Sequence, residues 1–257
     1  MKMLEDFGAG TLRFFEYAGG LVDLGSETAR YIFRLRIRLT ETVNQMYLLG
    51  YSSTVIVLLT SLFTGMVISL EAAGQAATYG FAAIVGGAVA WSSVRELGPM
   101  LSGVVVAGRV AAAIAAELGS MVVTEQIEAL QSLGLAPSRF LVVPRLIALM
   151  IMLPLLTVFA DVVSVLGGMW IAYTYARISN ETFMASVRQS IGFEDVLKGL
   201  FKALIFGIII AIVGSYQGLQ TRGGAAGVGK STTSAVVISI ILIFVSNFIL
   251  SYVLFRS

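Results

Sequence analysis

The sequence predicts an all-α, polytopic membrane protein with about five transmembrane helices. Hydrophobic residues make up 57% of the 257 residues and charged residues only 12%, whereas charged residues are usually about 25% of a globular domain. The mean hydropathy is +0.90. Uncharged stretches of about 20 residues, enough to cross the hydrocarbon core, recur along the chain.

The composition excludes several classes of function. The chain has no cysteine and no histidine, so disulfides, thiolate metal sites, imidazole catalysis and histidine-ligated zinc are impossible. The net charge is only +2, and no long basic tract suggests nucleic acid. We therefore expect no metal, no cofactor and no nucleic-acid partner in this chain.

Residues 1–40 are expected to form an interfacial amphipathic helix and a basic segment, ahead of a membrane domain at 41–257. Basic residues cluster at the end of this region and place the start of the first span in the cytoplasm by the positive-inside rule. The apolar side of the helix is carried by Leu12, Phe15, Ala18, Gly19 and Val22, and the basic cluster by Arg30, Arg34, Arg36 and Arg38. The region is too charged for a cleaved signal peptide.

Five stretches with few charges define the expected spans. They cover residues 42–70, 72–94 with a continuation to 116, 146–176, 203–221 and 231–255. The second stretch could be one long kinked helix or two shorter ones. An odd number of spans places the segments around Arg139 and Arg222 on the cytoplasmic side, together with the N-terminal region.

Four charged residues within or beside the spans are site candidates, namely Arg95, Glu96, Asp161 and Lys202. Charges inside a membrane are costly and normally face a cavity or a partner. Pro99 has no N–H, so it should free the carbonyl of Arg95 and kink the helix there. The alternative is structural: an Arg95–Glu96 ion pair that only pins helices together.

Residues 124–133 are expected to form a short helix outside the membrane. Its polar residues are Glu125, Gln126 and Glu128, and its apolar stripe is Ile127, Leu130 and Leu133. Gly134 and then Pro137 should terminate it. This helix either contacts a partner or rests its stripe on lipid.

The octapeptide GAAGVGKS at 224–231 matches the phosphate-binding loop of P-loop NTPases. An apolar stretch follows it at once, whereas a P-loop needs a buried strand before it and a soluble helix after it. We therefore expect a tight connection between two spans, with Ser231 or Thr232 capping the last helix, and no bound nucleotide.

Several short motifs occur in an order that resembles the MlaE (YrbE) permease family, whose members are membrane subunits of MCE-type ABC phospholipid transporters. They are RELGP at 95–99, AGR at 107–109, AELGSM at 116–121, TEQIEAL at 124–130, PR at 144–145 and GAAGVGKSTTSAVV at 224–237. The resemblance covers most of the chain from about residue 50.

The resemblance implies a homodimeric, multi-pass permease of the bacterial inner membrane that maintains outer-membrane lipid asymmetry. It implies an MlaF-like ATPase partner that holds ATP and Mg, an MlaD-like periplasmic MCE partner and an MlaB-like regulator. The chain itself would not be an enzyme. Residues 124–133 would be the helix that couples to the ATPase, and the four charged candidates would line the lipid path, with Arg95 or Lys202 pairing with the phosphate.

Two other classes of protein stay open on the residues alone. A membrane-bound P-loop enzyme would need a nucleotide fold and a Walker B aspartate, and the sequence shows neither. An ion-coupled secondary transporter of a small or lipidic substrate is favoured by Asp161 and Glu96, but no inverted repeat is visible.

Overall fold

The computed structural model describes residues 2–34, 38–79 and 84–255, and these residues form helices and turns without any strand. Five helical stretches in them are long and apolar enough to cross a membrane, which confirms the predicted all-α membrane fold. The stretches are Leu39–Gly74, Val85–Val123, Ser138–Thr174, Phe193–Leu219 and Gly224–Leu254.

The spans are built from the following helices. The first contains α2 (Leu39–Gln45) and α3 (Thr54–Tyr79), the second α4 (Val85–Ser92), α5 (Gly98–Val106) and α6 (Ala112–Val123), the third α8 (Val143–Thr174), the fourth α10 (Phe193–Leu219) and the fifth α11 (Gly224–Leu254). The second stretch is thus one long helix, interrupted by π-helical turns at Ser93–Leu97 and Ala107–Ala111. Further π-helical turns, at Met46–Gly50 and Ser138–Val142, precede α3 and α8.

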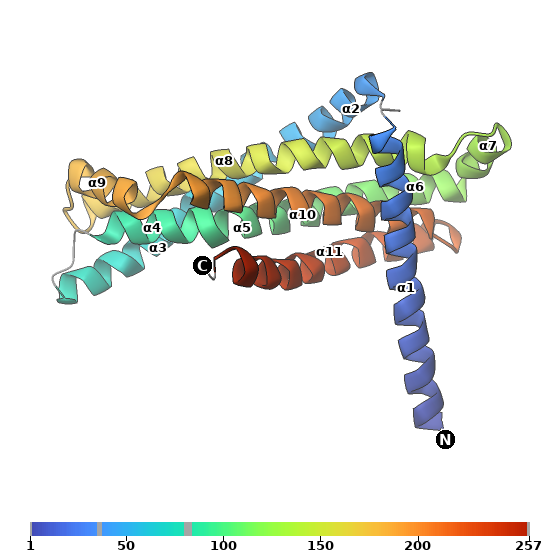
Figure 1. Cartoon of the computed structure of the whole chain (residues 1–257), viewed down its shortest axis with the longest axis horizontal. Helices are drawn as coiled ribbons and strands as arrows, with labels where there is room; N and C mark the ends of the chain where they lie inside the picture. Colours follow the sequence, from blue (N-terminus) through green and yellow to red (C-terminus); the bar gives the residue numbers. More distant parts are fainter. Residues whose placement is uncertain (1, 35–37, 80–83, 256–257) are drawn as a thin grey trace.

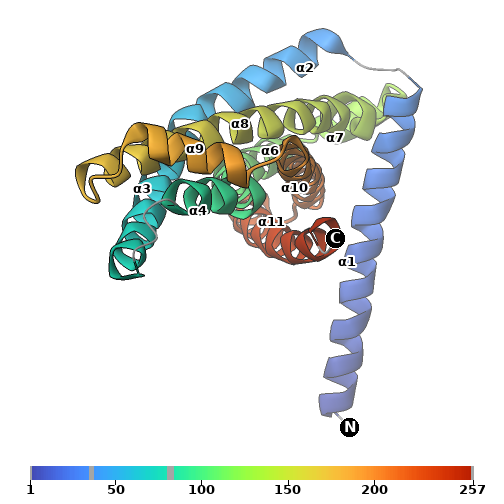
Figure 2. The same ribbon diagram turned by 60° about the vertical axis from the view of Figure 1, so that its left-hand side comes forward.

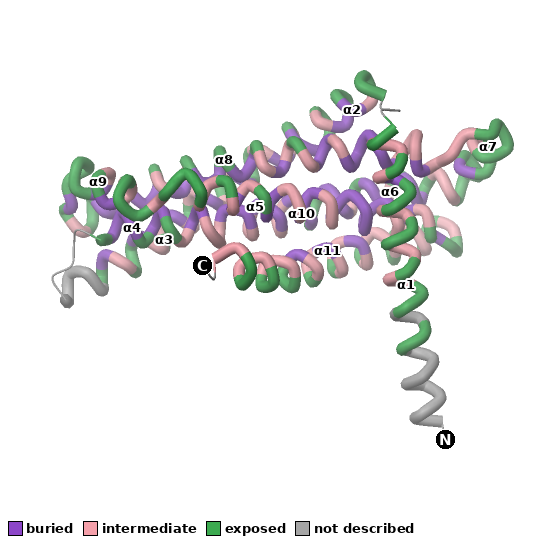
Figure 3. Tube along the Cα trace, in the orientation of Figure 1, coloured by how far each residue is buried: buried purple, intermediate pink, exposed green. Residues whose placement is uncertain are grey.

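The long helices lie side by side, and their buried residues face the middle of the bundle (Figures 1 and 3). The main core lies between α6, α8 and α10, where Leu118, Leu149 and Phe206 are inaccessible or nearly so. Glycine allows the closest approach, because a Cβ on Gly65 in α3 would collide with the backbone carbonyl of Ser164 in α8. Small residues let membrane helices pack at such short range.

The N-terminal helix α1 (Lys2–Phe33) extends away from the bundle, across the direction of the spans, in both ribbon views (Figures 1 and 2). Its second half packs on α10, where Tyr17 meets Tyr216 edge to face at 5.2 Å between ring centroids. Gln217 Nε2 also donates to the Tyr17 hydroxyl at 2.9 Å. A helix that runs across the spans is compatible with the predicted interfacial position, which stays a prediction.

Several predicted span limits were wrong. Helix α3 of the first span continues through Glu71 to Tyr79, and the second span begins at Val85 instead of at residue 72. Helix α10 begins at Phe193 and includes the charged residues before 203, and α11 begins at Gly224 instead of 231. The reason is physical: uncharged runs mark the hydrocarbon layer, while the helices extend beyond it into the polar interface.

The connections gather at the two ends of the bundle (Figure 1). The short helix α7 (Gln126–Ser132), the turn between α10 and α11, and α2 lie towards one end. The short helix α9 (Asn180–Ser190) and the end of α3 lie towards the other. This is the arrangement expected from an odd number of spans that begin at the end carrying α2.

Candidate functional site

The site begins at the π-helical turn Ser93–Leu97, immediately before Pro99. Because Pro99 cannot donate, the carbonyl of Arg95 has no donor at the usual helical position. Lys202 from α10 supplies a donor instead: its Nζ donates to the Arg95 carbonyl at 2.8 Å. The prediction of a freed carbonyl at Arg95 is therefore confirmed, and it binds one of the other candidate residues.

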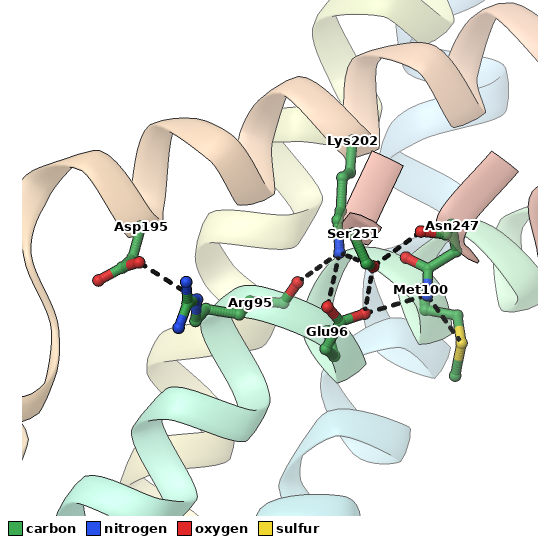
Figure 4. Close-up of polar contacts among 7 residues, drawn as sticks. All are labelled: Arg95, Glu96, Met100, Asp195, Lys202, Asn247 and Ser251. Atoms are coloured by element: carbon green, nitrogen blue, oxygen red, sulfur yellow. Dashed lines mark hydrogen bonds and ion pairs between the residues drawn. The ribbon is translucent and has the colours of Figure 1, made fainter. Parts of the chain in front are cut away.

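Lys202 is the centre of a charged network between three spans (Figure 4). Its side chain is 0% exposed, and its Nζ contacts Glu96 Oε1 at 2.9 Å and Ser251 Oγ at 2.7 Å. Glu96 Oε2 lies 3.0 Å from both Asn247 Nδ2 and Ser251 Oγ. An ammonium group has three donors, and here each has an acceptor, which offsets the cost of burying the charge.

Arg95 lies beside this network but pairs with a different residue. Its Nε is 3.2 Å from Asp195 Oδ1 in α10, and its guanidinium lies 4.0 Å from the ring centroid of Phe255 and 5.0 Å from that of Trp91. The Arg95–Glu96 ion pair of the structural alternative is not among these contacts. Successive residues of a helix do not face each other, so each of the two side chains instead binds α10.

Asp161 in α8 is separate from the network. Asp161 is 9% exposed, and its Oδ1 is buried with no hydrogen-bond partner among the described residues. The carboxyl instead lies against the backbone of Gly98, where an added Cβ would collide with Oδ1. Of the four predicted candidates, Glu96, Lys202 and the backbone carbonyl of Arg95 thus meet in the network, whereas Asp161 is separate from it.

The short helix after the second span runs from Gln126 to Ser132 as α7, so the predicted limits 124–133 were too wide. Glu125 has a left-handed backbone, with φ of 59°, and precedes the helix instead of joining its first turn. At the other end the Gly134 N–H binds the Gln131 carbonyl at 2.9 Å and the Leu135 N–H binds the Leu130 carbonyl at 3.0 Å. These two bonds form a Schellman motif, which confirms the predicted stop at Gly134.

The apolar stripe of α7 is divided between the bundle and the surface. Ile127 is 8% exposed, Leu130 is half-buried and Leu133 is 74% exposed. Glu125, Gln126 and Glu128 are exposed as well. Only part of the stripe is therefore accessible to a partner or to lipid.

Two arginines were missed as site candidates. Arg145, treated as a topology anchor, is buried and its Nη2 lies 2.7 Å from Glu117 Oε2 in α6. Arg109 lies in the π-helical turn Ala107–Ala111 of the second span, is exposed, and donates to the Ser52 carbonyl. Charged residues within a span often mark a functional site. This rule selected Arg95 as a candidate, and it applies equally to Arg109.

The octapeptide at 224–231 is helical and forms the first turns of α11. The predicted cap at Ser231 or Thr232 was wrong: the helix starts after Gly223, which has a φ of 89° that glycine adopts without strain. The Ser231 hydroxyl instead accepts from Thr221 Oγ1 at 3.0 Å. The connection between α10 and α11 is confined to residues 220–223.

Five spans with a charged network buried between them define a multi-pass membrane protein. The family model of the permease MlaE matches residues 42–253, and the chain belongs to this family. A probable ABC transporter permease of Synechocystis sp. is 46% identical over 226 residues, which are 88% of this chain and 86% of the relative. The corresponding protein of Rickettsia typhi is 36% identical, with 97% and 96% covered.

A third relative is the chloroplastic protein TRIGALACTOSYLDIACYLGLYCEROL 1 of Arabidopsis thaliana, which is 36% identical over 88% of this chain and 64% of its own length. The family makes this chain the permease subunit of an ABC transporter. Such a subunit works with an ATPase partner.

Proposed function

We propose that this permease moves phospholipids between the bacterial inner membrane and a periplasmic MCE partner of the MlaD type, as a homodimer. An MlaF-like ATPase would supply the energy and hold ATP and Mg, an MlaB-like protein would regulate the complex, and this chain would hold no cofactor. The observation that carries the proposal is the charged network at Lys202 and Glu96, placed within the spans of an MlaE permease. The Arabidopsis relative is named after trigalactosyldiacylglycerol, which is a glycerolipid, and this name supports a lipid substrate.

Arg95, whose side chain lies beside the network, is better suited than Lys202 to meet a phosphate headgroup. Lys202 is inaccessible, and its three donors are committed to Arg95, Glu96 and Ser251. The Arg95 side chain is 20% exposed, and only its Nε is engaged by Asp195. A guanidinium has five N–H donors in a fork that fits a phosphate, so Arg95 keeps donors for the lipid while Lys202 holds the site together.

The homodimer is supported by Arg109. This arginine is exposed although it lies within the second span, and an added Cβ at the neighbouring Gly108 would meet nothing within 4 Å. An arginine facing hydrocarbon is expensive, so such residues normally face a bundle interior or a water-filled cavity. A second copy of the permease across this face would enclose Arg109 in a cavity between the two subunits.

The coupling role of α7 is supported by its exposed residues and its position. Glu125, Gln126, Glu128 and Leu133 face away from the bundle at the end that the positive-inside rule assigns to the cytoplasm. An ATPase that contacts α7 would therefore act on the second span, which directly precedes it and carries both Arg95 and Arg109.

The test is transport by the reconstituted complex. The chain is purified in mild detergent together with its co-expressed partners, and ATP-dependent transfer of a fluorescent phospholipid is measured in liposomes. We expect Arg95→Gln to reduce transfer by about tenfold or more, since a charge-assisted hydrogen bond to the headgroup is lost. Lys198→Gln, which removes the cation that lies one turn before Lys202 in α10 and pairs with the exposed Glu194, is the control and should transfer normally.

Two outcomes would oppose the proposal. One is a purified complex without an ATPase. The other is transport driven by an ion gradient without ATP, which would favour the ion-coupled secondary transporter.

A further inference from the structure

A cavity of about 310 Å³ lies beside α8, towards the end of the bundle that carries α9. It is lined by Val94, Val158, Val162, Val165, Leu166, Met184 and Val196, together with Asp161. Every lining residue except Asp161 is apolar. Cavities of this size and character hold small ligands, whose orientation is fixed by a few polar groups.

Asp161 forms no hydrogen bond or ion pair with the residues that the structure describes. Its Oδ1 is buried and accepts no hydrogen bond from the described residues. The nearby Ser164 hydroxyl is bound to Ser93 Oγ at 2.7 Å, and Gly98 presents only backbone to the carboxyl. A buried acceptor without a donor costs free energy, and a carboxyl near the middle of a span is costlier still. Asp161 also lines the cavity, so a ligand that enters there meets this carboxyl.

The basic residues on the elements around the cavity do not supply a counter-charge. Arg95 beside the lining residue Val94 pairs with Asp195, and Lys202 in α10 pairs with Glu96. Lys198 pairs with Glu194. None of the ion pairs of the described residues, including those of the basic residues on α8, α9 and α10, involves Asp161, so the cationic group of a ligand would be its first counter-charge.

The mouth of the cavity faces the bilayer. Val158, Val162 and Leu166 lie on successive turns of α8 and are 38%, 53% and 50% exposed on the surface of the bundle. A ligand dissolved in the membrane can enter between them without crossing water. An aliphatic chain fits the apolar wall, and a head with N–H donors fits the carboxyl.

We propose that this cavity binds an amphiphile that carries a protonated primary amine, with the amine on Asp161 and the aliphatic chain along Val158, Val162 and Leu166. The site is distinct from the charged network at Lys202. The inference does not depend on phospholipid transport, because the binding can be measured without ATP or partners.

The test uses dodecylamine with a photoreactive diazirine in its chain, applied to the full chain in nanodiscs of phosphatidylcholine, whose headgroup has no N–H donor. Labelled peptides are mapped by mass spectrometry. We expect labelling of α8 and α9 to fall by about tenfold or more in Asp161→Asn, which is the contribution of a charge-assisted hydrogen bond. Glu181→Gln, an exposed acidic residue on α9, is the matched control and should label as the wild type does.

Three further arms make the result decisive. The same probe with a hydroxyl head should label α8 weakly and equally in wild type and Asp161→Asn. If Asp161→Asn fails to fold, Val162→Trp, which blocks the mouth and keeps the carboxyl, should cause the same loss of labelling.

Nanodiscs with phosphatidylethanolamine identify the source of the amine. If this lipid reduces labelling by the probe, the site takes a lipid headgroup; if labelling is unchanged, the site takes a single-chain amine. Equal labelling by the amine probe in wild type and in the variant that folds would overturn the proposal.

Discussion

At the scale of single residues, the site depends on a lysine that is fully enclosed. Lys202 joins the π-helical turn of the second span to α10 and α11, and every one of its donors is used. Removing one partner of a buried ion pair is more damaging than removing both, because the remaining charge is left unpaired. The free energy of unfolding should therefore fall more when Lys202 alone is replaced than when Lys202 and Glu96 are replaced together.

We predict that Lys202→Met lowers the free energy of unfolding by about 2–3 kcal/mol, less than for a fully buried pair, because Glu96 would lose its counter-charge but is 34% exposed and keeps its bonds from Asn247 and Ser251. Lys198→Met is the control on the same helix: Lys198 lies 3.6 Å from Glu194, which is 85% exposed, and such a pair contributes about 1 kcal/mol or less. Unfolding by denaturant in detergent micelles measures both values. The double variant Glu96→Met/Lys202→Met should recover much of the loss, and a double variant less stable than Lys202→Met would contradict this explanation.

At the scale of elements, the sequence predicted what depends on hydropathy and on proline. The five spans follow from the length of the apolar stretches, and the freed carbonyl of Arg95 follows from Pro99. The π-helical turn Ala107–Ala111 contains no proline, so nothing in the local sequence indicated it. The partners of Arg95, Glu96 and Arg145 were also unpredictable, because they are set by the rotation of one packed helix against another.

The divided stripe of α7 changes which residue best tests its coupling role. Leu133 is exposed whereas Ile127 is buried, so a charge at Leu133 should disturb a partner without disturbing the fold. We predict that Leu133→Asp leaves the melting temperature unchanged and abolishes co-purification of the ATPase.

Gln131→Asp, another exposed position of α7, adds the same charge outside the stripe and should retain the ATPase. Ile127→Asp should instead lower the melting temperature, because it places a charge in a buried contact. An ATPase that still binds Leu133→Asp would mean that α7 rests on lipid.

The start of α11 bears on nucleotide binding. A phosphate-binding loop wraps around the phosphates with successive backbone N–H groups, but at 225–231 the backbone is helical and most of these groups face along the helix. We predict that the purified chain neither hydrolyses ATP nor binds a photoreactive ATP analogue saturably. Labelling of the octapeptide that Lys230→Ala abolishes would refute this prediction.

At the scale of the whole molecule, the ends of the bundle carry the marks of two membrane surfaces. Trp170 and Tyr173 are exposed near the end of α8, and Tyr47 and Tyr51 are exposed near the start of the first span. Aromatic residues concentrate at membrane–water interfaces. The helix α1 crosses the bundle near the end that carries α2 and α7 (Figures 1 and 2). These features mark two membrane surfaces, and the arginines before the first span lead us to expect that the surface carrying α7 is the cytoplasmic one.

The absence of cysteine allows a direct test of this orientation, because a single introduced thiol reacts without background. We predict that Ser132→Cys in α7 is protected from a membrane-impermeant maleimide in intact spheroplasts and reacts after permeabilisation. Glu181→Cys in α9 should react in both conditions. Two spans separate the region before the first span from α7, and three separate it from α9, so α7 and α9 lie on opposite sides of the membrane. Both positions are exposed, so access to the reagent, not burial, decides the result. Equal reactivity of the two thiols in intact spheroplasts would require an even number of spans between them, and the third span, Ser138–Thr174, would then have to re-enter the membrane instead of crossing it.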